Sequence, residues 1–362
     1  MNDFKAESPE LQREELEAMN KVLLSGWYVL GKEVATFEEN WAAFCSARHA
    51  IGVGNGMDAI EIGLRALNIG AGAEVITTPM TAFATVLAIL RAGATPVLAD
   101  IDPSTGLLDM KSVERCMSAK THAVLLVHLY GQMREANRWA EFCAAKKIHF
   151  LEDCAQSHGA KWEGKGAGTI GAWGAYSFYL TKNLGALGDG GALITNEQKL
   201  ADLAKILRNY GQSDRYHHPV LGMNSRLDEL HAAVLTIRLK WLQAFIDRRR
   251  EIAVTFRSGI SNTAVTHLAE PIHAENHVYH LYVVRCRERE RLSAFLASRH
   301  IRTLVHYPIP VHAQPPCRVI RKDPQGLGEA ELFARECLSL PCHPQMSDVD
   351  VKTVIQSVNE FH

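Results

Sequence analysis

Ile148-His149-Phe150-Leu151-Glu152-Asp153 is an apolar run that ends in two adjacent carboxylates. Such a run is typical of a buried β-strand, and open α/β sheets bind their ligands at the carboxyl ends of the strands. Asp153 therefore predicts a ligand site, although a helix cap explains an isolated Asp equally well. If the strand continues, Glu152 points to the opposite face, so we expect only Asp153 to reach the ligand.

Apolar extended segments and amphipathic segments alternate around this run. We expect strands at 47–53, 74–78, 95–101, 123–128, 175–178 and 191–195, and helices at 11–24, 58–67, 85–91 and 134–146. This alternation is typical of a mostly parallel sheet that is covered by helices on both faces. The predicted fold class is therefore α/β.

The pattern becomes mainly helical after Glu197. We expect helices at 199–208 and 226–250, a strand at 279–286, a helix at 290–300, a Pro-rich loop at 306–316 and a closing helix near 350–358. The last part is typical of a small α+β domain. We predict a large domain over residues 1–235, followed by a long linking helix and a small C-terminal domain over residues 236–362.

The composition narrows the class of function. The chain has 39 basic and 40 acidic residues and no long basic stripe, so neither nucleic acid nor a membrane surface is an expected partner. The eight Cys and 17 His show no zinc-ligand spacing, which predicts reduced thiols and no metal. No secretory signal and no apolar run of membrane-spanning length is visible, so we expect a soluble, cytoplasmic protein.

The second informative segment is Ser177-Phe178-Tyr179-Leu180-Thr181-Lys182-Asn183-Leu184-Gly185, which contains a lysine among apolar residues. A lone lysine is most often a solvated surface residue. An apolar surround of Phe178, Tyr179 and Leu184 lowers the pKa of the amine and frees it to attack an aldehyde. Together with Asp153, which can keep a pyridine nitrogen protonated, Lys182 predicts a Schiff base with pyridoxal 5'-phosphate.

Two further features suit a phosphorylated ring. Gly52-Val53-Gly54-Asn55-Gly56-Met57-Asp58 lies between a strand and a helix, where free N–H groups can cradle a phosphate, although a plain Gly-rich turn is an alternative. The Ser177 hydroxyl could hold a phosphate oxygen, and Gln156 could donate to the phenolic oxygen of the ring. An ordinary strand serine and a solvated glutamine remain the alternatives.

Aromatic and His side chains give candidates for the other contacts. Phe83 could stack on the pyridine face, or it could be a core residue. His306-Tyr307-Pro308-Ile309-Pro310-Val311-His312 could present His306, Tyr307 and His312 to a ligand at little entropic cost, because Pro fixes the backbone. A rigid surface connection is the alternative for this loop.

These motifs, in this order, resemble the DegT-type sugar aminotransferases, which are pyridoxal phosphate enzymes of fold type I. The resemblance runs from about Ser25 to His343, and its further landmarks are the segments 25–31, 54–59, 128–131 and 222–230. It implies that Lys182 is the Schiff-base lysine and proton shuttle, Asp153 the pyridinium partner and Gln156 the contact to the ring hydroxyl. It also implies a phosphate cup made of the Met57 and Asp58 backbone and the Ser177 hydroxyl.

The same resemblance implies partners. Asn224 is similar to a residue that reaches the phosphate of the neighbouring subunit, which implies a homodimer with shared active sites. Segments 184–192 and 306–312 resemble the branch that aminates a nucleotide-linked, typically dTDP-linked, 3-keto-6-deoxyhexose with L-glutamate, which leaves as 2-oxoglutarate. Such amino sugars enter O-antigen, lipopolysaccharide or glycoside biosynthesis. Arg215 and Tyr216 stand where that branch contacts the substrate diphosphate.

Several alternatives stay open. The substrate could be a 4-keto sugar or a UDP-linked 3-keto sugar acid, and a non-catalytic regulator could keep the same cofactor-binding fold. Sugar dehydratase relatives carry His in place of Lys182, which argues against them. Three positions depart from the family: Ala82 replaces an aromatic residue, Leu180 replaces Pro, and Met57 replaces Thr or Ser.

Overall fold

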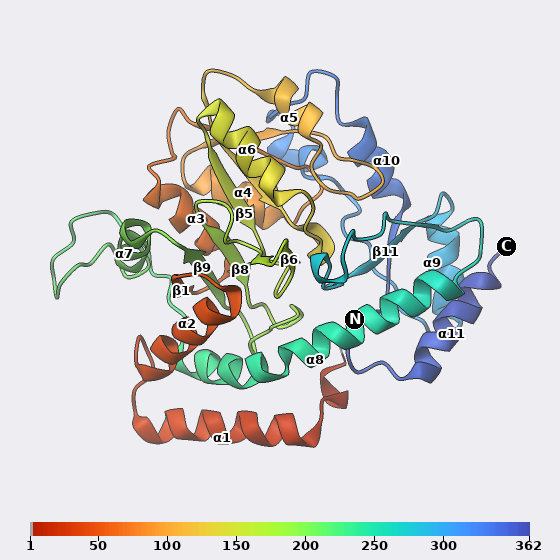
Figure 1. Ribbon diagram of the computed structural model, residues 1–362, viewed down its shortest axis with the longest axis horizontal. Coiled ribbons are helices and arrows are strands. Elements are labelled where there is room, and N and C mark those ends of the chain that lie inside the picture. The colour runs from red at the N-terminus through yellow and green to blue at the C-terminus, as the bar shows by residue number, and fades with distance from the viewer. Residues whose placement is uncertain (1–2) are drawn as a thin grey trace.

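An eight-stranded sheet forms the centre of the structure, a computed structural model that describes residues 3–362 (Figure 1). Its strands, in spatial order, are β1 (His49–Val53), β9 (Gly191–Thr195), β8 (Gly174–Ser177), β5 (His149–Asp153), β4 (Thr121–Val127), β2 (Glu74–Thr77), β3 (Thr95–Leu98) and β12 (Arg321–Lys322). Strand β9 is antiparallel to β1 and β8, and the other neighbouring strands are parallel. The predicted α/β fold with a mostly parallel sheet is confirmed.

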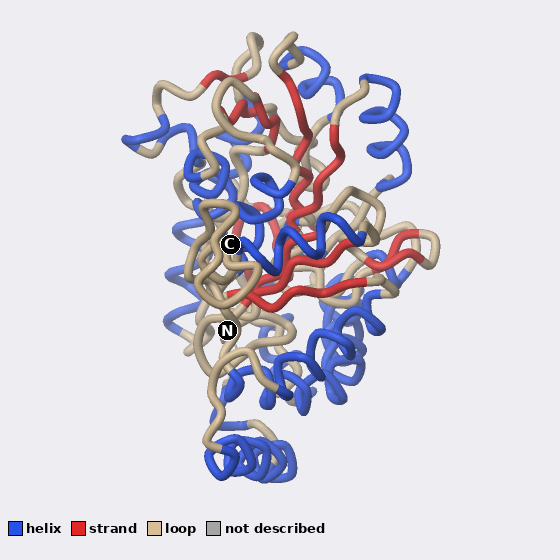
Figure 2. The backbone as a smooth tube through the Cα atoms, turned by 90° about the vertical axis from the view of Figure 1, so that its left-hand side faces the viewer, coloured by secondary structure: helices blue, strands red, loops and turns tan. Residues whose placement is uncertain are grey.

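Helices cover both faces of this sheet (Figure 2). They are α2 (Lys32–Cys45), α3 (Gly56–Ala66), α4 (Phe83–Arg91), α5 (Met110–Cys116), α6 (Ala136–Lys146), α7 (Gln198–Leu207) and the long α8 (Glu229–Gly259). Helix α1 (Pro9–Ser25) packs on α8 at the foot of the molecule in Figure 1. No helix of residues 3–362 is long and apolar enough to cross a membrane.

Helix α2 is absent from the elements that we predict above, although its buried residues Val34, Phe37, Trp41 and Cys45 follow helical spacing. Its first turn lacks a capping side chain of its own. The Glu229 carboxylate accepts the N–H groups of Gly31, Glu33 and Val34 instead, at 2.7, 2.9 and 3.0 Å. The free N–H groups at the start of α2 therefore find their acceptor in a residue that is distant in sequence.

The C-terminal part contains a three-stranded antiparallel sheet of β10 (Thr266–His267), β11 (Tyr282–Arg285) and β13 (Cys337–Leu340). Helix α9 (Arg289–Ser298) packs on β13, and α11 (Asp348–Asn359) packs on α8 and α9, so this part is α+β as predicted. Strand β12 and helix α10 (Gly328–Glu336) return to the large sheet, where the Asp100 carboxylate accepts two N–H groups of the first turn of α10. The domain boundary at residue 235 stays a prediction.

A loop between α7 and α8 extends away from the body of the molecule (Figure 1). Gly211 and Gly222 form its neck: a Cβ atom on Gly211 would collide with the carbonyl oxygen of Val220, and one on Gly222 with the nitrogen of Gly211. A bond from the Tyr210 N–H to the Met223 carbonyl, 2.9 Å long, closes the neck. Residues 212–221 form the loop beyond it. A small hairpin of β6 (Lys161–Trp162) and β7 (Lys165–Gly166) completes the described strands.

Candidate active site

Asp153 ends β5 and lies at a buried position. Its carboxylate accepts the Ala155 N–H at 3.1 Å and the Thr85 hydroxyl of α4 at 2.8 Å. Burial raises the pKa of this carboxyl, while both hydrogen bonds and the charge of Lys182 oppose the rise. The structure thus provides a fixed acidic group at the carboxyl end of the sheet, with Lys182 close enough to feel its charge.

Glu152 makes a separate set of contacts, as expected for the other face of β5. Its carboxylate accepts the N–H groups of Gly168, Ile170 and Gly171 at 2.7 to 2.9 Å and pairs with His128 at 2.9 Å. Ligand atoms of Glu152, His128 and Cys154 lie within 4.8 Å of one another. The Glu152 oxygens already accept hydrogen bonds from these donors. The cluster of Glu152, His128 and Cys154 therefore has a structural role.

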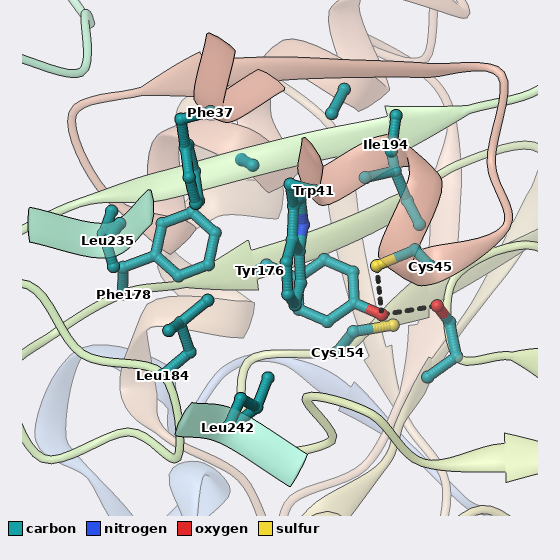
Figure 3. Close-up of a cluster of buried hydrophobic side chains, with 14 of the residues drawn as sticks. Phe37, Trp41, Cys45, Cys154, Tyr176, Phe178, Leu184, Ile194, Leu235 and Leu242 are labelled. Atoms are coloured by element: carbon teal, nitrogen blue, oxygen red, sulfur yellow. Dashed lines mark hydrogen bonds between the residues drawn. The ribbon is translucent and has the colours of Figure 1, made fainter. Parts of the chain in front are cut away.

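Lys182 lies in the loop after β8 and is partly buried. Loss of solvation lowers the pKa of its amine to about 8, against the pull of Asp153. The flanking Phe178 and Leu184 are buried in the aromatic cluster that Figure 3 shows, where Phe178 lies edge-on to Phe37 with ring centroids 5.2 Å apart. Tyr179, which we expect in this apolar surround, is 45% exposed and contributes nothing to it.

Gln156 is fixed between two tyrosines. Its side-chain oxygen accepts the Tyr130 N–H at 2.6 Å, and its amide nitrogen donates to the Tyr307 hydroxyl at 3.3 Å. Burial, with the Asp153 charge next in size, raises the pKa of Tyr307 to about 12. The Pro-rich loop therefore brings Tyr307 to Gln156 and Asp153, and Tyr307 remains a neutral hydrogen-bonding group.

The start of α3 meets the end of β8 at the expected phosphate cup. A Cβ atom on Gly56 would lie 2.7 Å from the Ser177 Cβ, so only glycine allows this approach. The Asp58 N–H, which we assign to the cup above, is instead used by the capping Asn55 oxygen at 2.8 Å. Within residues 3–362 the N–H groups of Gly56 and Met57 have no acceptor, and the dipole of α3 favours an anion there.

Four of the expected site residues lie elsewhere in this chain. Arg215 and Tyr216 are in the extended loop, where Tyr216 is 81% exposed. Asn224 follows the neck and forms a bridge with Asn209. His312 pairs with Glu331 at 3.0 Å, on the side of α10. Phe83, at the start of α4 and two residues from Thr85, is 37% exposed, which excludes the core alternative.

Three histidines surround Lys182, and two of them are not among the residues that we predict. His158 donates from Nε2 to the Ser177 carbonyl at 2.8 Å, and His280 donates from Nδ1 to the Asn183 side-chain oxygen at 3.2 Å. Burial first, then the charge of Lys182, lowers the pKa values of all three: to about 3 for His158, to about 4 for His306, and well below the ordinary range for His280. All three are therefore neutral at physiological pH.

The sequence carries a partial signal for these residues. His158 stands in the motif around Gln156, and His306 starts the Pro-rich segment. No local pattern connects His280 with Asn183, because 97 residues separate them. Their pairing becomes visible only once the chain has folded.

The sequence and the fold of this chain are similar to those of known proteins. Residues 9–359 match the DegT/DnrJ/EryC1/StrS aminotransferase family. A dTDP-3-amino-3,6-dideoxy-alpha-D-galactopyranose transaminase of Aneurinibacillus thermoaerophilus is 43% identical over 97% of this chain and 96% of the relative. A pleiotropic regulatory protein of Geobacillus stearothermophilus is 40% identical over 100% of this chain and 98% of its own length.

A solved structure is similar over almost the whole fold. The crystal structure of Streptomyces venezuelae DesV in complex with a ketimine intermediate has a TM-score of 0.95 and 41% identity, and the match covers 99% of this chain and 96% of that chain. The chain belongs to the DegT/DnrJ/EryC1/StrS aminotransferase family.

Proposed function

We propose that this aminotransferase uses pyridoxal 5'-phosphate to move the amino group of L-glutamate to C3 of a dTDP-linked 3-keto-6-deoxyhexose. The observation that carries the chemistry is that buried Asp153 lies within reach of the charge of Lys182, whose amine has a pKa of about 8. The sugar assignment is supported by the name of the Aneurinibacillus relative. The regulator alternative is not favoured, because Lys182 keeps the reactive setting that catalysis needs.

The site fits the cofactor. The N–H groups of Gly56 and Met57 and the Ser177 hydroxyl would hold its phosphate, and Asp153 would hold its ring nitrogen. Gln156, with Tyr307 beside it, would contact the ring hydroxyl. When bound, pyridoxal phosphate supplies an electron sink for the negative charge that develops on the carbon bearing the transferred amine. Stacking of Phe83 on the ring stays a prediction.

Lys182 performs the proton transfers. As a neutral amine it removes the proton from the α-carbon of glutamate, and as an ammonium it returns a proton to C3 of the sugar. A pKa of about 8 suits both directions, because neutral and charged forms are both populated near neutral pH. The reaction is balanced without another oxidant: glutamate leaves as 2-oxoglutarate and the ketone becomes an amine.

Asp153 and its partners keep the site ready for this chemistry. The Thr85 hydroxyl and the Ala155 N–H stabilise the carboxylate against the penalty of burial. The neutral histidines add no positive charge that would compete with Lys182 for Asp153. Proton transfer thus remains assigned to one amine.

A second copy of the chain is part of this proposal. The loop of Arg215 and Tyr216 extends away from the body of the molecule (Figure 1), and Asn224 follows the neck of that loop, which supports a role for these residues in a neighbouring subunit. Such a homodimer would contribute Asn224 to the partner's phosphate cup and Arg215 with Tyr216 to the substrate diphosphate. The location in the cytoplasm and a role in lipopolysaccharide or glycoside biosynthesis stay predictions of the sequence.

The test is a reaction of the purified protein with dTDP-linked 3-keto and 4-keto sugars and a UDP-linked 3-keto sugar acid, with glutamate as donor. We expect the 3-amino product from the dTDP-linked 3-keto sugar, identified by NMR, and a yellow protein that bleaches when glutamate is added. Lys182→Arg keeps the charge but presents no amine, so it should abolish turnover and the visible absorbance. Turnover by this variant, or amination of another carbon, contradicts the assignment.

A further inference from the structure

A cavity of about 300 Å³ opens next to the loop that contains Lys182, and two of its lining residues, His280 and His306, lie within reach of the charge of Lys182. Thr181, the residue before the lysine, lines it together with His280 and His306. The far wall comes from the segment before the Pro-rich loop and from β13, through Arg302, Leu304 and Ser339. The size is at the lower end for small-molecule pockets, so the cavity suits a compact ligand rather than a whole nucleotide sugar.

Arg302 is the single charged residue among the described residues that line this cavity. It is exposed, and no carboxylate of residues 3–362 pairs with its guanidinium. His280 and His306 are neutral there, since their pKa values are lowered. Among the described residues the cavity therefore presents one charged side chain with no carboxylate paired to it, and arginine geometry matches a carboxylate.

The rest of the lining is suited to an aliphatic segment. Leu281, Leu304 and Leu340 supply apolar surface, while Ser339 is engaged with Nδ1 of His306 at 2.8 Å. A ligand with a short methylene chain and a terminal carboxylate would place its chain on these leucines. Its other end would then lie toward Thr181, the residue that precedes Lys182.

We propose that this cavity is the subsite of the amino donor and that Arg302 binds the distal carboxylate of a short dicarboxylic amino acid. The inference rests on the proposed function, because the donor must bring its α-carbon to Lys182. It deepens that function by assigning donor specificity to one residue. A diphosphate is the other anion that Arg302 could pair with, and the experiment separates the two.

The test compares Arg302→Gln and Arg302→Lys with Arg318→Gln in the cofactor-loaded protein. Arg318 is a matched control, because it is also an exposed arginine but lies outside the cavity. Calorimetry measures the Kd of glutarate, an unreactive dicarboxylate of the same length as glutamate, and of butyrate, which lacks the second carboxylate. Steady-state kinetics give the KM of glutamate and of the sugar nucleotide.

We expect Arg302→Gln to raise the Kd of glutarate and the KM of glutamate by about tenfold or more, since a charge-assisted hydrogen bond is lost. Butyrate binding, the visible spectrum and the sugar KM should stay at wild-type values, Arg302→Lys should be intermediate, and Arg318→Gln should match the wild type. A rise confined to the sugar KM overturns the inference in favour of a diphosphate contact. Unchanged glutarate binding overturns it as well.

The outcomes also distinguish this inference from the proposed function. If no dTDP-linked sugar is aminated but glutarate binding still depends on Arg302, the sugar assignment is wrong and the donor subsite stands. If amination proceeds as proposed and the wild type does not prefer glutarate to butyrate, the subsite is wrong and the function stands.

Discussion

At the scale of single residues, the reactivity of this chain depends on how water is excluded around Lys182. Desolvation lowers the pKa of the amine to about 8, and Asp153 is the charge that opposes the shift. His158, His280 and His306 lose their protons for the same reason, so none of these three histidines competes with the lysine as a cation. Burial therefore determines the protonation states of Lys182 and of these three histidines.

The titration of Lys182 in the cofactor-free chain checks this account. We expect its acetylation by trace acetic anhydride, followed by mass spectrometry, to rise through a midpoint near pH 8. Asp153→Asn should move that midpoint to lower pH, because the carboxylate favours the charged amine. Exposed Lys199 serves as the reference for reagent reactivity. A midpoint near the ordinary value of 10.5 contradicts the burial argument.

The lowered pKa of Lys182 also makes the free energy of unfolding depend on pH. The folded pKa lies below the unfolded one, so between about pH 8 and pH 10.5 the unfolded chain binds more protons at this site. Stability contributed by Lys182 therefore increases with pH across that window. Below it, the folded state must keep the ammonium in a poorly solvated place.

At the scale of elements, the first turn of α3 is a tightly constrained junction of the site. Gly56→Ala should place a methyl group 2.7 Å from the Ser177 Cβ and so disturb the cup. We expect a loss of about 1–3 kcal/mol in the free energy of unfolding and faster loss of cofactor on dialysis. Urea unfolding and the visible absorbance after dialysis measure the two effects.

Gly328→Ala is the matched control. Gly328 is also the first residue of a helix, α10, and a Cβ atom there has no neighbour within 4 Å. This variant should unfold like the wild type or be slightly more stable, because alanine restricts the unfolded chain. Equal behaviour of the two variants contradicts the idea of a tight approach at Gly56.

Elements also show where prediction from sequence reaches its limit. The strand that ends at Asp153 and the lysine segment are local patterns, so the α/β class and the central pair follow from the sequence. Helix α2 begins on the carboxylate of Glu229, which is 198 residues from Gly31, and its start has no local cap signal. The Asp58 N–H donates to the Asn55 side chain and is therefore not available to a phosphate. The position of Asp58 at the start of the helix does not reveal this competition.

At the scale of the whole molecule, apolar side chains remain exposed on α1 and just after it. Leu24 is 79% exposed, Trp27 63% and Leu23 56%. Monomers rarely expose neighbouring large apolar groups, so this surface fits the proposed contact with a second copy. It lies on the helix that packs on α8, the element that connects the two parts of the fold.

We expect Leu24→Glu to weaken the dimer by adding charge to an apolar contact. Analytical ultracentrifugation should show the wild type at twice 40.1 kDa and the variant shifted toward 40.1 kDa. Val319→Glu is the control, because Val319 is 93% exposed and lies far along the chain from α1. A wild type that sediments as a monomer, or a variant that remains fully dimeric, contradicts the assignment of this surface.

The glycine neck at Gly211 and Gly222 has a consequence for how such proteins diversify. A side chain at either position would collide with backbone, so neither glycine can be replaced without moving the chain. The ten residues 212–221 between them are not restricted in this way. Insertions, deletions or exchanges within the loop leave α7 and α8 where they are. Under the proposed function, we expect exchange of this loop between relatives to alter the preference for the acceptor sugar while the rest of the fold is retained.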